Sequence, residues 1–216
     1  MDFSTIDTAL VAKLLLLLLI GMGPKIALVP FLEKTKTFDA ETQRAVGRRM
    51  VVTAVVTALV LFALGGLLMR LLHITGGAVA VAGGIILALL AIKMVVGHDE
   101  KAVEEELVAP NDPAKIAVYP LAVPYLLNPV GITILIIASD EVVSLASVGL
   151  VLGLVLLVGA FDYWIFANID KLSKRLNPTG LVISEVVFGI LLTAVAVQLT
   201  VTGLGSLGII APSAAH

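Results

Sequence analysis

The sequence predicts an all-α integral membrane protein with six transmembrane helices, arranged as two inverted three-helix repeats. Hydrophobic residues make up 59% of the 216 residues and charged residues 14%, whereas soluble domains carry about 25% charged residues. Apolar stretches of about 20 residues, the length that crosses a bilayer, recur along the whole chain. The two halves also resemble each other at a constant offset. We therefore expect a single membrane domain over residues 1–216 without a separate soluble part.

Polar segments separate the predicted spans. The N-terminus lacks the basic region and the cleavage site of a signal peptide, so the first span is expected to stay in the mature protein. A turn at His73–Gly76 separates the second span from the third, and the acidic pair Asp140–Glu141 follows the fourth. The predicted spans cover about residues 8–32, 50–72, 77–96, 116–138, 142–167 and 179–202.

The distribution of lysine and arginine predicts the orientation. The first, third and fifth connections are rich in these residues, whereas the second has only Arg70 and the fourth connection and the tail have none. Because basic residues favour cytoplasmic loops, the first polar loop (33–49), the long loop 97–115 and the loop 168–178 are expected in the cytoplasm. Both termini, including the tail 204–216, then face outward.

The two halves match at an offset of 105 residues. Pro24 corresponds to Pro129 and Gly84 to Gly189. Each half (8–96 and 116–203) holds three spans, an odd number, so the second half enters the membrane from the opposite side. Inverted repeats of this kind are typical of secondary transporters.

The first span is interrupted near its middle by Gly21, Gly23 and Pro24, and Lys25 follows directly. Proline removes a helical hydrogen bond, and glycine weakens the turns around it. In hydrocarbon, the freed backbone groups need partners, so such a break is tolerated only where it is buried or lines a cavity. The break therefore indicates a functional position.

The fourth span carries the corresponding interruption. Pro120 and Pro124 precede Asn128, Pro129 and Gly131. Paired interruptions at matching positions predict a substrate site near the bilayer midplane. Half-helix N-termini there suit a carboxylate, and freed carbonyls suit an ammonium. The predicted substrate-binding residues are Gly21, Gly23, Pro24, Lys25, Asn128, Pro129 and Gly131.

Several of these polar residues have more than one interpretation. Lys25 either faces the cavity and holds an anionic substrate group, pairs with a buried acid as a gate, or snorkels to the cytoplasmic interface. The Asn128 side chain either forms a hydrogen bond with a substrate group or forms hydrogen bonds with backbone groups. Asp162 and Glu185 reach a similar depth from the same side, and either could neutralise Lys25 or carry a coupling proton. For Asp162, beside Tyr163 and Trp164, an interfacial position is the alternative.

Other chemistries find no support in the sequence. It has no cysteine, and it contains no P-loop, GxGxxG, HExxH or nucleophile elbow, so we expect no enzyme, no cofactor, no metal site and no ATP-driven transport. Its basic residues lack the aromatic interleaving of nucleic-acid binders. The expected partners are a small-molecule substrate and membrane lipid, and a homo-oligomer is compatible with the sequence.

The chain resembles the MarC family of six-helix neutral amino acid transporters, within the LysE-like superfamily. The resemblance covers about residues 10–204. It is carried by the broken first span ending Pro30-Phe31-Leu32, by Gly83-Gly84-Ile85-Ile86, and by Pro120-Leu121-Ala122-Val123-Pro124. The family pattern Asn-Pro-x-Gly appears here as Asn128-Pro129-Val130-Gly131, while the first break reads Gly23-Pro24-Lys25-Ile26. The resemblance implies a multi-pass protein of a prokaryotic inner membrane.

Three functions follow as hypotheses. The first is a secondary transporter of small neutral amino acids or similar zwitterions, working by alternating access, as the resemblance implies. The second is a proton-coupled anion or ion carrier that uses Lys25 with Glu185 or Asp162. The third is a non-transporting membrane partner, for which a buried charge and two broken helices have no use.

Overall fold

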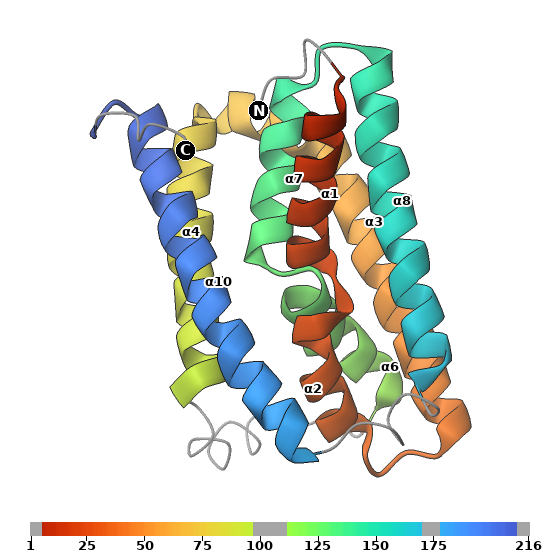
Figure 1. Ribbon diagram of the computed structural model, residues 1–216. Helices are drawn as coiled ribbons and strands as arrows, with labels where there is room; N and C mark the ends of the chain where they lie inside the picture. Colours follow the sequence, from red (N-terminus) through yellow and green to blue (C-terminus); the bar gives the residue numbers. More distant parts are fainter. Residues whose placement is uncertain (1–5, 97–111, 170–177, 211–216) are drawn as a thin grey trace.

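The computed structural model describes residues 6–96, 112–169 and 178–210 of the chain, and all regular secondary structure in these ranges is helical (Figure 1). Five helical stretches in the described chain are long and apolar enough to cross a membrane, and a bent helix pair, Pro113–Leu126 with Pro129–Glu141, raises the number to six when it is counted as one span. The predicted all-helical membrane fold is confirmed.

The first half contains α1 (Thr8–Met22), α2 (Pro24–Thr35), α3 (Ala40–Leu72) and α4 (Gly76–Val96). The second half contains α6 (Pro113–Ile116), the wider helical segment η1 (Ala117–Leu126), α7 (Pro129–Glu141), α8 (Leu145–Ala167) and α10 (Pro178–Ser206). Within η1 the backbone is extended at Tyr119 and Val123, since each precedes a proline, which disfavours the helical conformation.

Local signals explain where the helices begin and end. The carboxylate of Asp7 accepts the Leu10 N–H at 2.7 Å and caps α1, and Ser144 forms a capping box with Ser147 at the start of α8. Pro24 and Pro129 occupy the first position of α2 and α7, where a missing N–H costs no hydrogen bond. The two prolines fix the helix starts at the centre of the molecule.

The helix starts repeat at the offset found in the sequence. α2 begins at Pro24 and α7 at Pro129, and α3 begins at Ala40 and α8 at Leu145. α2 and α7 run from the middle of the molecule toward opposite ends (Figure 1). We call the end at which α2 finishes the α2 side and the opposite end, where α1 begins and α10 ends, the α7 side. This is the geometry of an inverted repeat.

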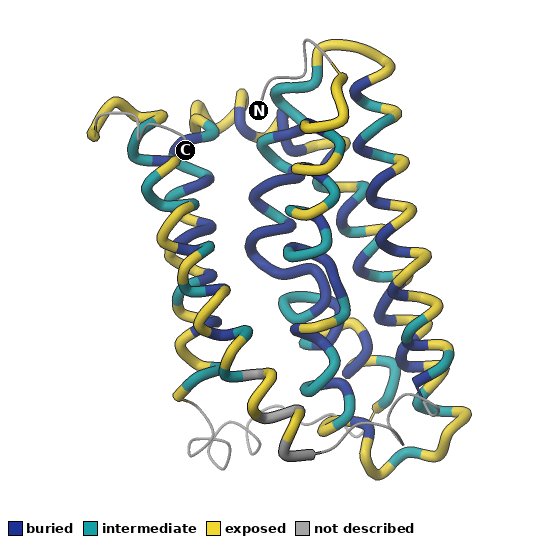
Figure 2. The backbone as a smooth tube through the Cα atoms, viewed as in Figure 1, coloured by how far each residue is buried: buried dark blue, intermediate teal, exposed yellow. Residues whose placement is uncertain are grey.

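Corresponding spans of the two repeats pack against each other. α1 contacts α7, α2 contacts η1, α3 contacts α8, and α4 contacts α10 most extensively of all. A main apolar core lies between α1, α2, α3, η1, α7 and α8, and its buried positions fill the middle of Figure 2. A smaller cluster joins α4 and α10 to the broken spans through Ile26, Val130 and Ile134. The α4–α10 pair is thus attached to the rest mainly through α7 and to a smaller extent through α2.

The polar loop expected over residues 33–49 is shorter than predicted. α2 extends to Thr35 and α3 already begins at Ala40, so Arg44, Arg48 and Arg49 are helical. Helix propensity explains this difference, because Ala, Glu, Gln and Arg are good helix formers and a helix can continue beyond the hydrocarbon with polar residues. Most of the predicted loop 97–115 lies outside the described residues.

Candidate functional site

The two predicted breaks meet at the centre of the molecule. Span one is interrupted at Gly23 alone, whose backbone is extended (φ −81°, ψ 160°) between α1 and α2. Span four is interrupted at Leu127 and Asn128, with a bend of 72° between the helices on either side. The backbones of Gly21 and Gly131 are in direct contact, because a Cβ on either glycine would overlap the other residue. Glycine is required at both positions.

Asn128 connects the two breaks through hydrogen bonds. Its side-chain oxygen accepts the N–H groups of Val130 (2.9 Å) and Gly131 (3.4 Å) and so caps α7. Its amide nitrogen donates to the Ile20 carbonyl at 2.6 Å, and its backbone N–H donates to the Gly21 carbonyl at 2.9 Å. Asn128 therefore satisfies freed donors of one span and freed acceptors of the other, which is the second of its two sequence-based interpretations.

The predicted residues come together, but they fill the space that they were expected to line. Gly21, Gly23, Asn128, Pro129 and Gly131 are all buried. Small side chains allowed the two backbones to close on each other, so no substrate fits between Gly21 and Gly131 in this arrangement. We call this contact the junction. It is a scaffold from which the flanking half-helices extend.

The break in span one leaves its half-helix uncapped. Gly23 gives α2 no side-chain cap, whereas Asn128 caps α7. The free N–H groups of an uncapped N-terminus carry partial positive charge. Lys25, in the first turn of α2, adds a full charge. The positive groups of the site therefore gather on α2.

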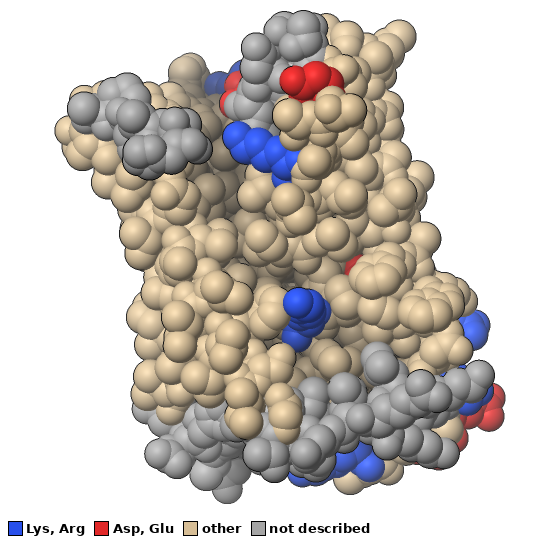
Figure 3. Space-filling view, viewed as in Figure 1, with Lys and Arg blue, Asp and Glu red and all other residues tan. Residues whose placement is uncertain are grey.

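Lys25 faces α10. The Lys25 side chain is exposed, and its Nζ lies 4.3 Å from the ring centre of Phe188, a cation–π distance. Figure 3 shows a group of basic atoms at mid-height on this face, with uncharged atoms directly around it and further charged atoms toward the top and the lower right. Sequence reasoning missed Phe188. The repeat offset was a signal that could have found it, because Phe188 stands where the first half has Gly83.

The sequence suggested Asp162 and Glu185 as partners of Lys25, and of these two side chains the structure describes that of Asp162. Asp162 is fully buried, and neither of its carboxyl oxygens has a hydrogen-bond partner in the described chain. It therefore forms no ion pair with Lys25 in this structure. Its burial also differs from the exposed Tyr163 and Trp164 side chains beside it, for which an interfacial position was the alternative. Glu185 belongs to α10, three residues before Phe188, but its side chain lies outside the described residues, so its pairing with Lys25 stays a prediction.

The α7 side of the junction is tightly packed. Gly83 of α4 lies against the Thr133 side chain, and Gly65 of α3 lies against Ile136, so close that a Cβ on either glycine would overlap its neighbour. The N–H of Gly66 donates to the Ser139 hydroxyl at 2.8 Å. α3 and α4 thereby hold α7 from both sides.

The α2 side is packed much less. Only a small part of α2 contacts α10, and contact between α2 and α8 is slight in the described chain. Two ring contacts lie at this side, the Lys25–Phe188 contact and the pair Phe31–Phe166, whose centroids are 5.0 Å apart. The repeat offset places Leu28 and Phe188 where the other side has Thr133 and Gly83. A phenylalanine of α10 therefore stands where α4 has a glycine on the other side.

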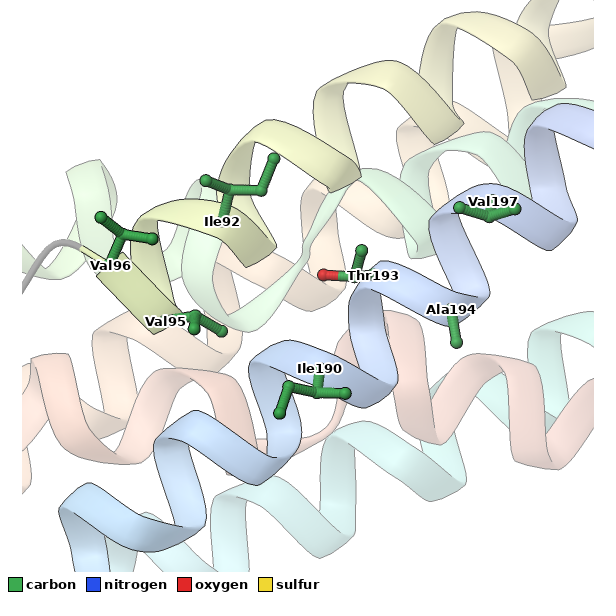
Figure 4. A pocket seen from close by; sticks show the side chains of 7 residues that line it. All are labelled: Ile92, Val95, Val96, Ile190, Thr193, Ala194 and Val197. Carbon is green, nitrogen blue, oxygen red and sulfur yellow. The ribbon is translucent and has the colours of Figure 1, made fainter.

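A pocket with a volume of about 410 Å³ lies elsewhere, between α4 and α10 (Figure 4). Thr193 is the one polar residue of its lining, and its hydroxyl already donates to the Gly189 carbonyl at 2.8 Å. The pocket therefore offers a polar substrate nothing to bind. Its lining residues are Ile92, Val95, Val96, Ile190, Thr193, Ala194 and Val197.

Comparison with known proteins identifies relatives along nearly the whole chain. Residues 8–207 match the family model described as MarC family integral membrane protein. A UPF0056 membrane protein of Methanocaldococcus jannaschii is 28% identical over 85% of this chain and 90% of its own length. UPF0056 membrane proteins of Aquifex aeolicus (29% identical, 92% and 94% covered) and Pyrococcus horikoshii (27%, 91% and 98%) are also similar. No solved structure matches the chain.

Proposed function

This chain belongs to the MarC family of integral membrane proteins, and on that premise we propose that it is a secondary transporter of small neutral amino acids or similar zwitterions. The proposed mechanism is alternating access, in which a central site opens first to one side of the membrane and then to the other. The proposed residence is a prokaryotic inner membrane with both termini outside.

One observation carries the proposal: two inverted half-helices extend from one junction, and only one of them is tightly packed. α7 is held by α3 and α4, while α2, within the described chain, lacks comparable contacts with α8 and α10. In an inverted repeat, exchange of these two packing arrangements converts an opening on one side into an opening on the other. A membrane scaffold has no need for such unequal halves.

The polar groups on the open side suit an amino acid. The substrate carboxylate would bind the Lys25 ammonium and the free N–H groups at the start of α2. Phe188 would form one wall of the site and hold the Lys25 ammonium in position. The junction would limit the depth to which the substrate enters, because Gly21 and Gly131 are in contact there.

Flux in proteoliposomes tests this function. The purified full-length protein is reconstituted, and uptake of labelled glycine, alanine and serine is measured against empty liposomes. We expect saturable uptake of at least one of them. Absence of flux with all three, beside a reconstituted transporter that works, would reject the proposal and leave the non-transporting partner.

Variants of Lys25 test the site. A charged hydrogen bond contributes about 1.5–3 kcal/mol, so Lys25→Met is expected to raise KM roughly ten- to a hundredfold, while Lys25→Arg retains most of the affinity. The control is Lys13→Met, because Lys13 is an exposed lysine of α1 outside the site. Equal effects of the Lys25→Met and Lys13→Met substitutions would contradict the assignment.

A carrier of small organic anions is the second candidate. It is favoured by the position of the Lys25 ammonium, which in the described chain lies over an aromatic ring rather than beside a carboxylate. Competition separates the two functions. Uptake of labelled alanine that is inhibited by excess glycine but not by acetate or lactate supports the amino acid transporter. Uptake of labelled lactate that is inhibited by acetate but not by glycine supports the anion carrier.

A further inference from the structure

Asp162 is the one buried polar side chain in the described chain whose side-chain atoms find no hydrogen-bond partner. Its exposure is 0%, and both carboxyl oxygens lack a hydrogen bond. An ionised carboxylate without partners is costly to bury. Intramembrane acids that persist despite this cost commonly belong to ion or proton pathways. The amino acid site on α2 does not use this carboxyl group.

The neighbours of Asp162 on α8 place it at the level of the first break. Three residues before it, Gly159 packs against Val55 of α3 and approaches the Met22 side chain at the end of α1. Four residues after it, the Phe166 ring packs on Phe31 of α2. Residues three and four apart lie on one helix face, so Asp162 faces inward between these contacts. The start of α2, at Pro24, lies between the same two levels.

In the described chain, no charged group on α1, α2 or α3 pairs with Asp162. Lys25 is on the opposite face of α2 from Ala27, which is buried in the same core cluster as Phe31 and Phe166. Because neither Asp162 oxygen has a hydrogen-bond partner, no charged side chain described on α1, α2 or α3 pairs with it. Those side chains are Lys13, Lys25, Glu33, Lys34, Glu41, Arg44, Arg48, Arg49 and Arg70.

We propose that Asp162 binds the proton that couples transport to the proton gradient. This inference rests on the proposed transport function and names its driving ion. A proton on Asp162 removes the charge and suits the apolar core around it. After the proton leaves, the carboxylate attracts the uncapped N-terminus of α2, which carries partial positive charge. Proton binding and release would thus move α2 between two positions.

The charge balance follows from this scheme. One carboxyl group binds one proton on one side of the membrane and releases it on the other. A zwitterion carried with it has no net charge, so each cycle moves one positive charge. Transport is then electrogenic, and it is driven by an inward proton gradient and by a negative interior.

Transport by Asp162→Asn, in proteoliposomes loaded with and without labelled alanine, tests the proposal. The wild type is expected to accumulate alanine several-fold when a proton gradient is imposed. Asp162→Asn, whose side chain has similar size but binds no proton, is expected to exchange alanine at equal pH and to lose the accumulation. The control is Asp140→Asn, since Asp140 is a partly exposed acid paired with Arg70; this variant should accumulate alanine like the wild type.

Two results would overturn the proposal while leaving the transport function intact: full proton-driven accumulation by Asp162→Asn, or wild-type accumulation that follows a sodium gradient and ignores pH. If the wild type exchanges no amino acid, the transport function fails instead.

Infrared spectroscopy then tests Asp162 by itself. A pH-dependent C=O band of a protonated carboxyl, present in the wild type and absent from Asp162→Asn, supports proton binding, and its absence from the wild type refutes it. Should Asp162→Asn fail to fold, Asp162→Glu is expected to keep coupling with a shifted pH profile, and an unchanged profile would count against the proposal.

Discussion

The two helix breaks occupy equivalent positions in the repeats, yet they are stabilised differently. Asn128 caps α7 and binds the carbonyl groups of Ile20 and Gly21. Gly23, at the equivalent position, caps nothing, and a Cβ there would overlap the Leu19 carbonyl oxygen. The break in span four is therefore capped by the side chain of its own Asn128, while the break in span one leaves the positively charged start of α2 without a side-chain cap.

The residues next to each break extend this contrast. Val130 of α7 is 1% exposed and packs in the cluster that joins α4 and α10 to the breaks. Lys25, its equivalent in α2, is exposed beside Phe188. An apolar residue is buried beside one break, whereas a charged residue is exposed beside the other. The comparison teaches that a repeated fold can hold a fixed half and a movable half through a few substitutions at matched positions.

The largest effect is expected from a side chain at the junction. Gly131→Leu places carbon atoms where the Gly21 carbonyl lies. Because backbone on both sides blocks relief, we expect a loss of about 3 kcal/mol or more, seen as little or no folded protein by size-exclusion chromatography in detergent. The control is Gly149→Leu on α8, where an added Cβ meets nothing within 4 Å. Normal yield of Gly131→Leu would mean that the breaks are not in contact.

Removal of the Asn128 side chain is expected to have the next largest effect. Asn128→Ala removes a helix cap and leaves buried backbone groups of both spans unpartnered, a loss of about 2–4 kcal/mol. Thermal unfolding measures it. Asn168→Ala is the control, because the Asn168 side chain donates one hydrogen bond, to Trp164 at the end of α8. If the two variants unfold alike, Asn128 does not hold the junction.

A smaller effect is expected on the open side. Phe188→Ala removes the ring beneath Lys25, and a cation–π contact contributes about 0.5–2 kcal/mol. KM for the transported amino acid should rise about two- to thirtyfold with little change in stability. Phe161→Ala, a partly exposed phenylalanine of α8, should leave KM unchanged. An effect of equal size in both would remove Phe188 from the site.

The smallest effect is expected from the ion pair at the rim of the α7 side. Arg70 Nε lies 3.2 Å from Asp140 Oδ1, and the two side chains are 76% and 36% exposed. Exposed pairs contribute less than about 1 kcal/mol, so Arg70→Gln should hardly change thermal unfolding. A loss as large as that of Asn128→Ala would show that charge, rather than close backbone packing, seals this side.

The breaks and the repeat could be predicted because their signals are local. Proline and glycine interrupt a helix wherever they stand, and equal spacing in the two halves is visible in the residues themselves. Pro24 and Pro129 therefore located both interruptions to within a few residues.

The use of the site residues could not be predicted, because it depends on contacts between distant segments. Asn128 turned toward the backbone of a helix more than 100 residues away rather than toward a cavity. Phe188 gained its importance only where α10 passes Lys25. The separation of Lys25 from Asp162 reflects the faces on which α2 and α8 pack, and depth estimates along single helices do not report faces.

Distance measurements between spin labels test the central claim, that the α2 side opens and closes against the α7 side. The chain has no cysteine, so cysteines at Lys34 and Ile183 can report the distance from α2 to α10, and cysteines at Ile74 and Val143 the distance across the α7 side. On addition of alanine, we expect the first distance to shorten and the second to lengthen. Two distances that stay unchanged, in a protein shown to bind alanine, would contradict alternating access about the junction.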